Sequence, residues 1–253
     1  MNNQYCYVVS FSGGKDSTAM LLKLLEEKKK IDYILFVDLG AEYPEMYKHI
    51  QQVNTYLTKN FNLKITTLKP KFSMIHYIVS YKRKYGPYRG YPYGFPSYKC
   101  RWCTGLKKDI LNHFFTKLQK PVINYIGFTA DESGRANRLK RKCSRKRVFR
   151  FPLIESGIHS NETLDYCYSF GFDWNGLYTH LERASCFLCP FQRDKELWYL
   201  INNRPELWKQ IKELEAKVRS TGLNQWKFRP SESCDEIEKR LLKRRIENET
   251  PIR

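Results

Sequence analysis

The chain has 253 residues and no run of 18 apolar ones, so it is long enough for one large domain with an appendage and is not expected to span a membrane. Lysine and arginine total 45 against 26 acidic residues, a formal net charge of +19, which favours a polyanionic partner, DNA or RNA. A first strand is expected from Tyr5, which leaves no room for a signal peptide, so we expect a cytoplasmic location and reduced cysteines.

The first two predicted elements flank a glycine-rich turn. The apolar run Tyr5–Ser10 predicts a buried strand, and Thr18–Leu25 predicts a helix packed on it. The turn between them is at the N-terminus of a helix, where backbone N–H groups and the helix dipole hold anions. Two glycines allow close approach of a phosphate, a lysine expected to be exposed adds charge, and hydroxyls add donors. We call this turn the phosphate loop: Ser12, Gly13, Gly14, Lys15, Asp16 and Ser17.

Strands and helices then alternate along the chain. Further strands are expected at 31–37, 63–68 and 122–127, and helices at 44–60, 72–81 and 104–118. This alternation predicts an α/β fold, with a mostly parallel sheet of five or six strands and helices on both faces. Ligands bind at the carboxyl ends of such strands, where Ser12 and Asp38 are expected. A last strand is expected at 148–154, at an edge of the sheet or with Pro152 at a strand end, because proline lacks an N–H group.

Two irregular segments carry aromatic and basic side chains. The segment Tyr81–Tyr98 holds six tyrosines and four basic residues between glycines and prolines. It suits unstacked bases and phosphates, or it is a self-packed loop, and the sequence favours neither. The segment Arg135–Arg150 has nine lysines or arginines directly after the strand expected at 122–127. We interpret this second segment as a polyanion cradle.

The last third of the chain is predicted to be helical. Helices are expected at 162–170, 195–202, 205–219 and 231–247. We therefore expect two domains, an α/β nucleotide-binding domain over 1–160 and a helical subdomain over 161–253.

Four of the eight cysteines have metal-ligand spacing. Cys100 with Cys103, and Cys186 with Cys189, form two Cys-x-x-Cys pairs, which in a cytosolic chain predict a four-thiolate site for zinc or an iron–sulfur cluster. Such a site ties the helical part to the α/β core. Cys6 is expected in the core, whereas Cys143, Cys167 and Cys234 have no assigned role.

The phosphate loop resembles the PP-loop of ATP pyrophosphatases, and the order of features resembles the phosphoadenosine phosphosulfate (PAPS) reductase family of PP-loop proteins. Further matches are the Asp-x-Gly and Pro-Glu residues of the segment Asp38–Glu45, the segment Gly127–Arg135, and Phe151-Pro152-Leu153. The cysteine layout resembles the adenylylsulfate-reducing branch, where four cysteines bind a [4Fe-4S] cluster, and PP-loop enzymes that put sulfur into DNA or tRNA. Thr129 replaces the family's arginine, and Arg135 falls one residue early. The reductases' catalytic Glu-Cys-Gly-His motif is replaced by Ser233-Cys234-Asp235-Glu236.

This resemblance implies a fold like that of the adenine nucleotide α-hydrolases and ATP with Mg²⁺ as cofactors. It implies catalytic roles for Lys15 and Asp16, and a [4Fe-4S] cluster or structural Zn²⁺ at the four paired cysteines. The implied enzyme adenylates an oxygen of DNA or tRNA for sulfur incorporation, with a sulfur donor such as a cysteine desulfurase. The alternatives are a sulfonucleotide reductase that uses Cys234 and a non-catalytic nucleic-acid-binding module. The expected nucleotide contacts are Ser10, Ser12, Gly13, Gly14, Lys15, Asp16, Ser17, Asp38, Gly127 and Arg135.

Overall fold

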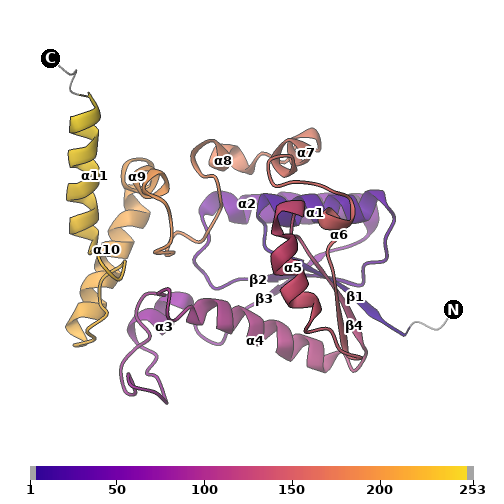
Figure 1. Cartoon of the computed structure of the whole chain (residues 1–253), viewed down its shortest axis with the longest axis horizontal. Coiled ribbons are helices and arrows are strands. Elements are labelled where there is room, and N and C mark those ends of the chain that lie inside the picture. Colours follow the sequence, from indigo (N-terminus) through magenta and orange to yellow (C-terminus); the bar gives the residue numbers. More distant parts are fainter. Residues whose placement is uncertain (1–3, 250–253) are drawn as a thin grey trace. The chain divides into compact units, whose positions relative to one another are not determined.

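The computed structural model describes residues 4–249, and their side chains as far as residue 245. These residues form two compact units, which we describe one at a time (Figure 1). The first unit contains residues up to 38, 44–69 and 107–178, and the second contains 39–43, 70–106 and residues from 179 onward. These units group the residues that contact one another in the folded chain. The expected domain boundary at residue 160 is a different statement, because it concerns which part of the chain folds by itself. That boundary stays a prediction.

The first unit is built on a parallel sheet of five strands in the order β3-β2-β1-β4-β5. Each strand pairs in parallel with its neighbours, as Val8 with Tyr33 and Val8 with Asn124 show for β1. The expected parallel α/β sheet is confirmed, and β5 lies at an edge as expected. The strands are β1 (Cys6–Phe11), β2 (Tyr33–Val37), β3 (Ile65–Leu68), β4 (Val122–Ile126) and β5 (Arg147–Arg150).

Helices cover both faces of this sheet. On one face Cys6 and Val8 pack with Phe115 of α4 (Trp102–Lys117), which belongs to the first unit from residue 107 onward. The opposite face carries α1 (Lys15–Glu26) and α2 (Pro44–Phe61), whose apolar stripes are buried. Figure 1 shows α1 and α2 on one side of the strands and α4 on the other.

The chain after β4 forms short elements of the same unit. The strand expected at 148–154 is wrong in its second half, because β5 ends at Arg150 and Pro152 begins a helix. Proline suits a first helical position, where the missing N–H group has no partner to lose. The elements are the 3-10 turn η1 (Ala130–Glu132), α5 (Ser133–Lys140), α6 (Pro152–Glu155), α7 (Thr163–Ser169) and the 3-10 turn η2 (Trp174–Gly176). Helix α8 (Leu177–His180) begins in this unit.

The second unit is mainly helical. Its helices are α3 (Met74–Val79), the first turn of α4, α9 (Asp194–Asn203), α10 (Pro205–Ser220) and α11 (Cys234–Glu249). Buried Trp208, Ile211 and Leu214 form the apolar stripe of α10. Among residues 4–249, no helix combines the length and the apolar character that crossing a membrane requires.

Candidate functional site

The phosphate loop joins β1 to α1 and is held by bonds among its own residues. Gly13 has a φ of +81°, a left-handed conformation that favours glycine, and a Cβ there would lie 2.7 Å from Met46 Sδ. The Ser17 hydroxyl accepts a hydrogen bond from the Ser12 N–H at 3.2 Å. The same hydroxyl donates to the Gly14 carbonyl at 2.9 Å. The loop leads into the first turn of α1, where the helix dipole favours an anion.

The Lys15 amine is already bonded within the first unit. Its side chain is 11 % exposed, and Nζ lies 2.7 Å from Asp16 Oδ1, with which it forms an ion pair. The amine also donates to the Ser160 carbonyl and hydroxyl and to the Thr163 hydroxyl, the last two at 2.8 Å. The expectation of an exposed lysine is wrong, because an ammonium taken out of water needs acceptors and residues 160–163 supply them. We call Asp16, Ser160 and Thr163 the lysine cage.

A second pair of residues fixes the position of the cage. Asp131 Oδ1 lies 2.7 Å from His159 Nδ1, and Asp131 Oδ2 accepts from the Ser160 N–H at 2.7 Å. The hydrogen bond to Asp131 raises the pKa of His159, and the same bond lowers the pKa of Asp131. This pair therefore holds the backbone at Ser160, where the lysine amine is bound.

Aromatic side chains close the other side of the phosphate loop. Trp174 is fully buried, and its Nε1 donates to the Gly13 carbonyl at 2.7 Å. The His49 ring stacks on Trp174 at 4.0 Å between centroids, and burial lowers the pKa of His49 to about 3, so it is neutral. The Tyr178 hydroxyl accepts from the Lys15 N–H at 2.9 Å. In this arrangement both a carbonyl and an N–H group of the loop are bonded to residues 174–178.

Gly127 and Arg135 lie beyond the end of β4. A Cβ on Gly127 would lie 2.9 Å from the Asp16 carbonyl oxygen, so the end of β4 touches the first turn of α1 and no side chain fits. The Arg135 guanidinium pairs with Glu132 and lies 4.4 Å from the Phe128 ring centroid. Gly127 thus adjoins the phosphate loop, whereas Arg135 is bonded within its own turn.

Two other expected nucleotide contacts are polar groups on neighbouring strands. Asp38 follows β2, is 8 % exposed, and accepts a 2.8 Å hydrogen bond from the Tyr47 hydroxyl. Lys69 Nζ lies 3.9 Å from its other oxygen. Ser10, on β1, donates to Asn124 Oδ1 on β4 at 2.9 Å. The carboxyl ends of β1 and β2 are at the same edge of the sheet, as expected for the phosphate loop and Asp38.

The two Cys-x-x-Cys pairs both belong to the second unit. The segments that carry them are neighbours, because the Tyr98 and Phe191 rings lie 4.5 Å apart and the Arg101 guanidinium is 4.7 Å from the Phe191 centroid. A hydrogen bond with the Cys186 thiol lowers the pKa of the Cys189 thiol. The late pair is therefore formed as a pair, beside the segment that carries the early one.

These thiols do not form a complete metal site. Among residues 4–249, no three His, Cys, Asp or Glu side chains are close enough to hold a metal ion. Both pairs are half-buried, and none of the four cysteines is in a disulfide. An iron–sulfur cluster or a structural zinc ion needs four ligands around one position. The two cysteine pairs lie on neighbouring segments, but their four thiols are not gathered around one position.

The unpaired cysteines differ in exposure. Cys6 is buried in the core as expected, and Cys143 is exposed. Cys167 is fully buried, and burial raises its pKa to about 12. Cys234 is also fully buried, and burial together with the Glu215 carboxylate raises its pKa far above the ordinary value. A buried neutral thiol is a poor nucleophile, because the thiolate is the reactive form.

The tyrosine-rich segment is largely self-packed. The Arg83 guanidinium lies between the rings of Tyr88 and Tyr93, at 5.1 and 5.0 Å from their centroids. Tyr85 and Tyr98 differ from these, with 85 % and 73 % of their surface exposed. The packing of Arg83 agrees with the self-packed interpretation, and binding of bases by the exposed rings stays a prediction.

The basic segment 135–150 is also divided. Arg147 is half-buried, bonded to Asn112 Oδ1 at 2.8 Å and placed 4.5 Å from the Phe115 centroid. Arg141 and Arg145 are exposed. Arg147 of β5 is thus held inside the first unit, whereas the cations of α5 are exposed, and the polyanion cradle stays a prediction.

The profile of the phosphoadenosine phosphosulfate reductase domain matches residues 6–180. The chain belongs to the PAPS reductase family. It is 25 % identical to the uncharacterized protein MJ0066 of Methanocaldococcus jannaschii, over 80 % of this chain and 40 % of that protein. It is 26 % identical to the uncharacterized protein MJ0973 of the same organism, over 90 % of this chain and 54 % of that protein. The chain thus spans about half the length of the curated relatives it matches.

Among solved structures, the chain is similar to the U34-tRNA thiolase NcsA from Methanococcus maripaludis with its [4Fe-4S] cluster. The identity is 16 %, the match covers 88 % of this chain and 76 % of that one, and the TM-score is 0.46. A likeness of this size carries no argument about activity.

The PAPS reductase match extends past residue 160 and includes residues that the sequence analysis missed. Ser160, Thr163, Trp174 and Tyr178 all contact the phosphate loop. No spacing or composition marks them, because each is a single polar or aromatic residue far from the loop in sequence.

Proposed function

We propose that this PAPS reductase family member is an ATP pyrophosphatase that adenylates an oxygen of a nucleic acid, DNA or tRNA, so that sulfur replaces it. The observation that carries the proposal is the phosphate loop. Left-handed Gly13 leads into the first turn of α1, and Gly127 lets the end of β4 touch that turn. This gives a bare backbone surface for phosphates at the carboxyl end of the central strand.

In the proposed reaction, the substrate oxygen attacks the α-phosphorus of ATP and the bond to the bridging oxygen of pyrophosphate breaks. Negative charge then grows on the leaving pyrophosphate, where Lys15 and the loop N–H groups neutralise it. A sulfur donor, for which a cysteine desulfurase is a suitable source, next attacks the atom that carries the activated oxygen, and AMP leaves with that oxygen. The two steps release pyrophosphate and then AMP.

In the proposal, ATP displaces two protein groups from their contacts with the phosphate loop. A phosphate oxygen at the loop accepts from the Lys15 N–H in place of the Tyr178 hydroxyl. The Lys15 amine turns from the lysine cage toward the pyrophosphate, and Asp16 is then available for Mg²⁺, a hard cation that prefers carboxylate and phosphate oxygens. We assign Ser10, Ser12, Ser17, Asp38, Gly127 and Arg135 to the remaining contacts of ATP.

The four paired cysteines remain the proposed ligands of a [4Fe-4S] cluster or a zinc ion. The contact of Tyr98 with Phe191 supports this assignment, because it makes the two cysteine segments neighbours. Closing the site requires the early pair to join the late one. Iron, zinc and sulfide analysis of anaerobically purified protein, with the Cys186→Ser variant alongside, measures this directly.

Burial of Cys234 argues against the sulfonucleotide reductase alternative. Its thiol is inaccessible and its pKa is raised, so it cannot readily take a sulfite group from a nucleotide. The third alternative, a non-catalytic nucleic-acid-binding module, predicts binding without formation of AMP.

The test is to incubate the protein with ATP labelled at the α-phosphorus and with tRNA or duplex DNA. We expect labelled AMP and an equal amount of pyrophosphate, and loss of both in the Lys15→Met variant. Turnover of adenylylsulfate or PAPS with thioredoxin in the absence of ATP, and no AMP from ATP, would establish the reductase instead.

A further inference from the structure

The first unit contains a cavity of about 830 Å³ on the face of the sheet that carries α4. It lies over β4 and β5 and is bounded by α4, by Leu139 of α5 and by residues 142–149. We call it the α4 cavity. None of residues 12–17 lines it, so it is separate from the phosphate loop, and among the proposed ATP contacts Ser10 alone is a lining residue. Its volume is in the range of pockets that bind drug-sized or nucleotide-sized ligands.

The floor of the α4 cavity is apolar with one buried amide. Ile126 of β4, Leu111 of α4 and Phe149 of β5, all partly exposed, supply the apolar surface. Asn124 lies two residues before Ile126 on β4 and is only 4 % exposed. Its Oδ1 accepts from the Ser10 hydroxyl, which leaves its amide nitrogen as an available donor within the part of the chain that the structure describes.

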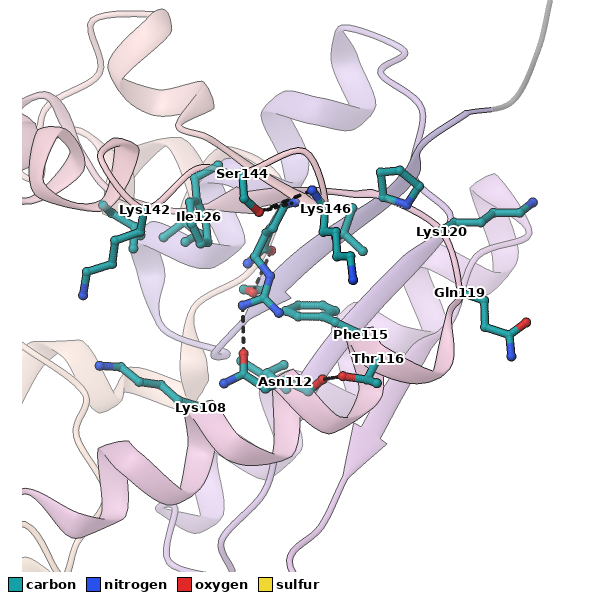
Figure 2. A pocket seen from close by; sticks show the side chains of 18 residues that line it. Lys108, Asn112, Phe115, Thr116, Gln119, Lys120, Ile126, Lys142, Ser144 and Lys146 are labelled. Atoms are coloured by element: carbon teal, nitrogen blue, oxygen red, sulfur yellow. Dashed lines mark hydrogen bonds between the residues drawn. The ribbon is translucent and has the colours of Figure 1, made fainter.

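The rim of the α4 cavity is positively charged. None of the described residues that line it is an aspartate or a glutamate. Figure 2 shows Lys108 of α4 and Lys142 toward one end of the view, Lys120 toward the other, and Lys146 beside Ser144 across from α4. The five cations that line it are Lys108, Lys120, Lys142, Lys146 and Arg147.

Apolar floor, buried amide and cationic rim together match one class of ligand. We propose that the α4 cavity binds an unpaired nucleotide of a single-stranded segment of the nucleic-acid substrate. The base lies on the apolar floor with its edge at Asn124, and the flanking phosphates lie on the lysines. A free mononucleotide presents the same chemistry, and the experiment distinguishes the two. The inference rests on the proposed function for the identity of the strand, but its binding test needs no ATP.

Two variants separate the rim from the floor. Lys142→Ala/Lys146→Ala removes two exposed cations, and Lys59→Ala/Lys64→Ala removes two exposed cations from residues outside the cavity. Asn124→Leu removes the amide and keeps the side-chain size. Fluorescence anisotropy measures the affinity for a labelled single-stranded RNA octamer and for the same octamer with abasic sites, across a salt series. Thermal unfolding checks that each variant is folded.

We expect the Lys142/Lys146 variant to lose affinity for both strands and to reduce the salt slope by about 1.4, since each phosphate contact to a single strand contributes about 0.7. The Lys59/Lys64 control keeps the wild-type slope. Asn124→Leu weakens binding of the intact octamer by about 3- to 10-fold and leaves the abasic octamer unchanged.

Equal slopes in the two lysine variants, or equal affinity of wild-type protein for intact and abasic strands, would overturn the proposal. Saturable binding of AMP that Asn124→Leu abolishes, with no binding of the octamer, would replace the strand by a mononucleotide. These outcomes leave the AMP-forming assay untouched, so failure of the α4 cavity and failure of the proposed enzyme are distinguishable.

Discussion

Replacing Lys15 tests whether this residue stabilises the fold besides its proposed role in catalysis. Its amine has one carboxylate and three neutral acceptors, and its side chain is 11 % exposed. Lys15→Met keeps the stem and removes the charge. Hydrogen bonds to charged groups contribute about 1.5–3 kcal/mol each, but they are not additive. Because Asp16 is 34 % exposed, water can solvate it after the change, so we expect a total loss of about 2–3 kcal/mol.

The matched control is on the same helix. Lys23 pairs with Glu27 one turn away at 3.5 Å, and both side chains are partly exposed. Such surface pairs contribute about 0.3–0.5 kcal/mol, so Lys23→Met should cost no more than this. Urea unfolding followed by circular dichroism measures both, and AMP formation is measured in parallel. The reasoning is refuted if Lys15→Met is no less stable than Lys23→Met, whatever happens to the activity.

Three further predictions follow from the first and second units. Gly127→Ala should lower the free energy of unfolding by about 1–3 kcal/mol and reduce ATP turnover, because its Cβ would lie 2.9 Å from a backbone oxygen. Gly134→Ala, with open space around it, is the control, and equal effects of the two would contradict the close contact. The His159–Asp131 pair should stabilise the fold most at pH values between the ordinary pKa values of the two groups, 3.8 and 6.5. The raised pKa of His159 means that its contribution is complete below 6.5 and is lost as the pH rises through the folded value. The lowered pKa of Asp131 means that its contribution is complete above 3.8 and is lost as the pH falls. An NMR titration in which His159 has an unshifted pKa would rule this out. Cys234→Ala should leave AMP formation at the wild-type rate, and a complete loss of AMP formation in folded protein would restore a role for that thiol.

Local pattern predicted the sheet and the phosphate loop because both depend on residues close in sequence. Apolar runs of five or six residues form β1, β2 and β4, and the glycines between β1 and α1 mark the loop. Gly13 and Gly127 are needed for reasons that residue type alone indicates, conformation and close approach. The order of the strands, β3-β2-β1-β4-β5, was not predicted, because strand–helix alternation indicates parallel pairing but not which strands are neighbours.

The surroundings of the loop were not predictable in this way. Lys15 reaches Ser160 across 145 positions, and the Gly13 carbonyl accepts from Trp174 across 161. Such contacts depend on how the chain after β5 returns to α1. The spacing of apolar residues within one helix or strand carries no information about that path. For the same reason Arg147 was counted with the exposed cations, although Phe115 and Asn112 hold it inside the unit.

The bond between Trp174 and the Gly13 carbonyl also has a consequence for how the protein is made. Ribosomes add about 5–20 residues per second, so Gly13 is synthesised roughly 8–32 s before Trp174, which lies 161 positions later. During that interval the nascent loop has its glycines and its lysine but neither of its partners Trp174 and Tyr178. The chain therefore completes the surroundings of its phosphate loop late, when residues from the end of the first unit have been synthesised, and not when the loop itself has been translated.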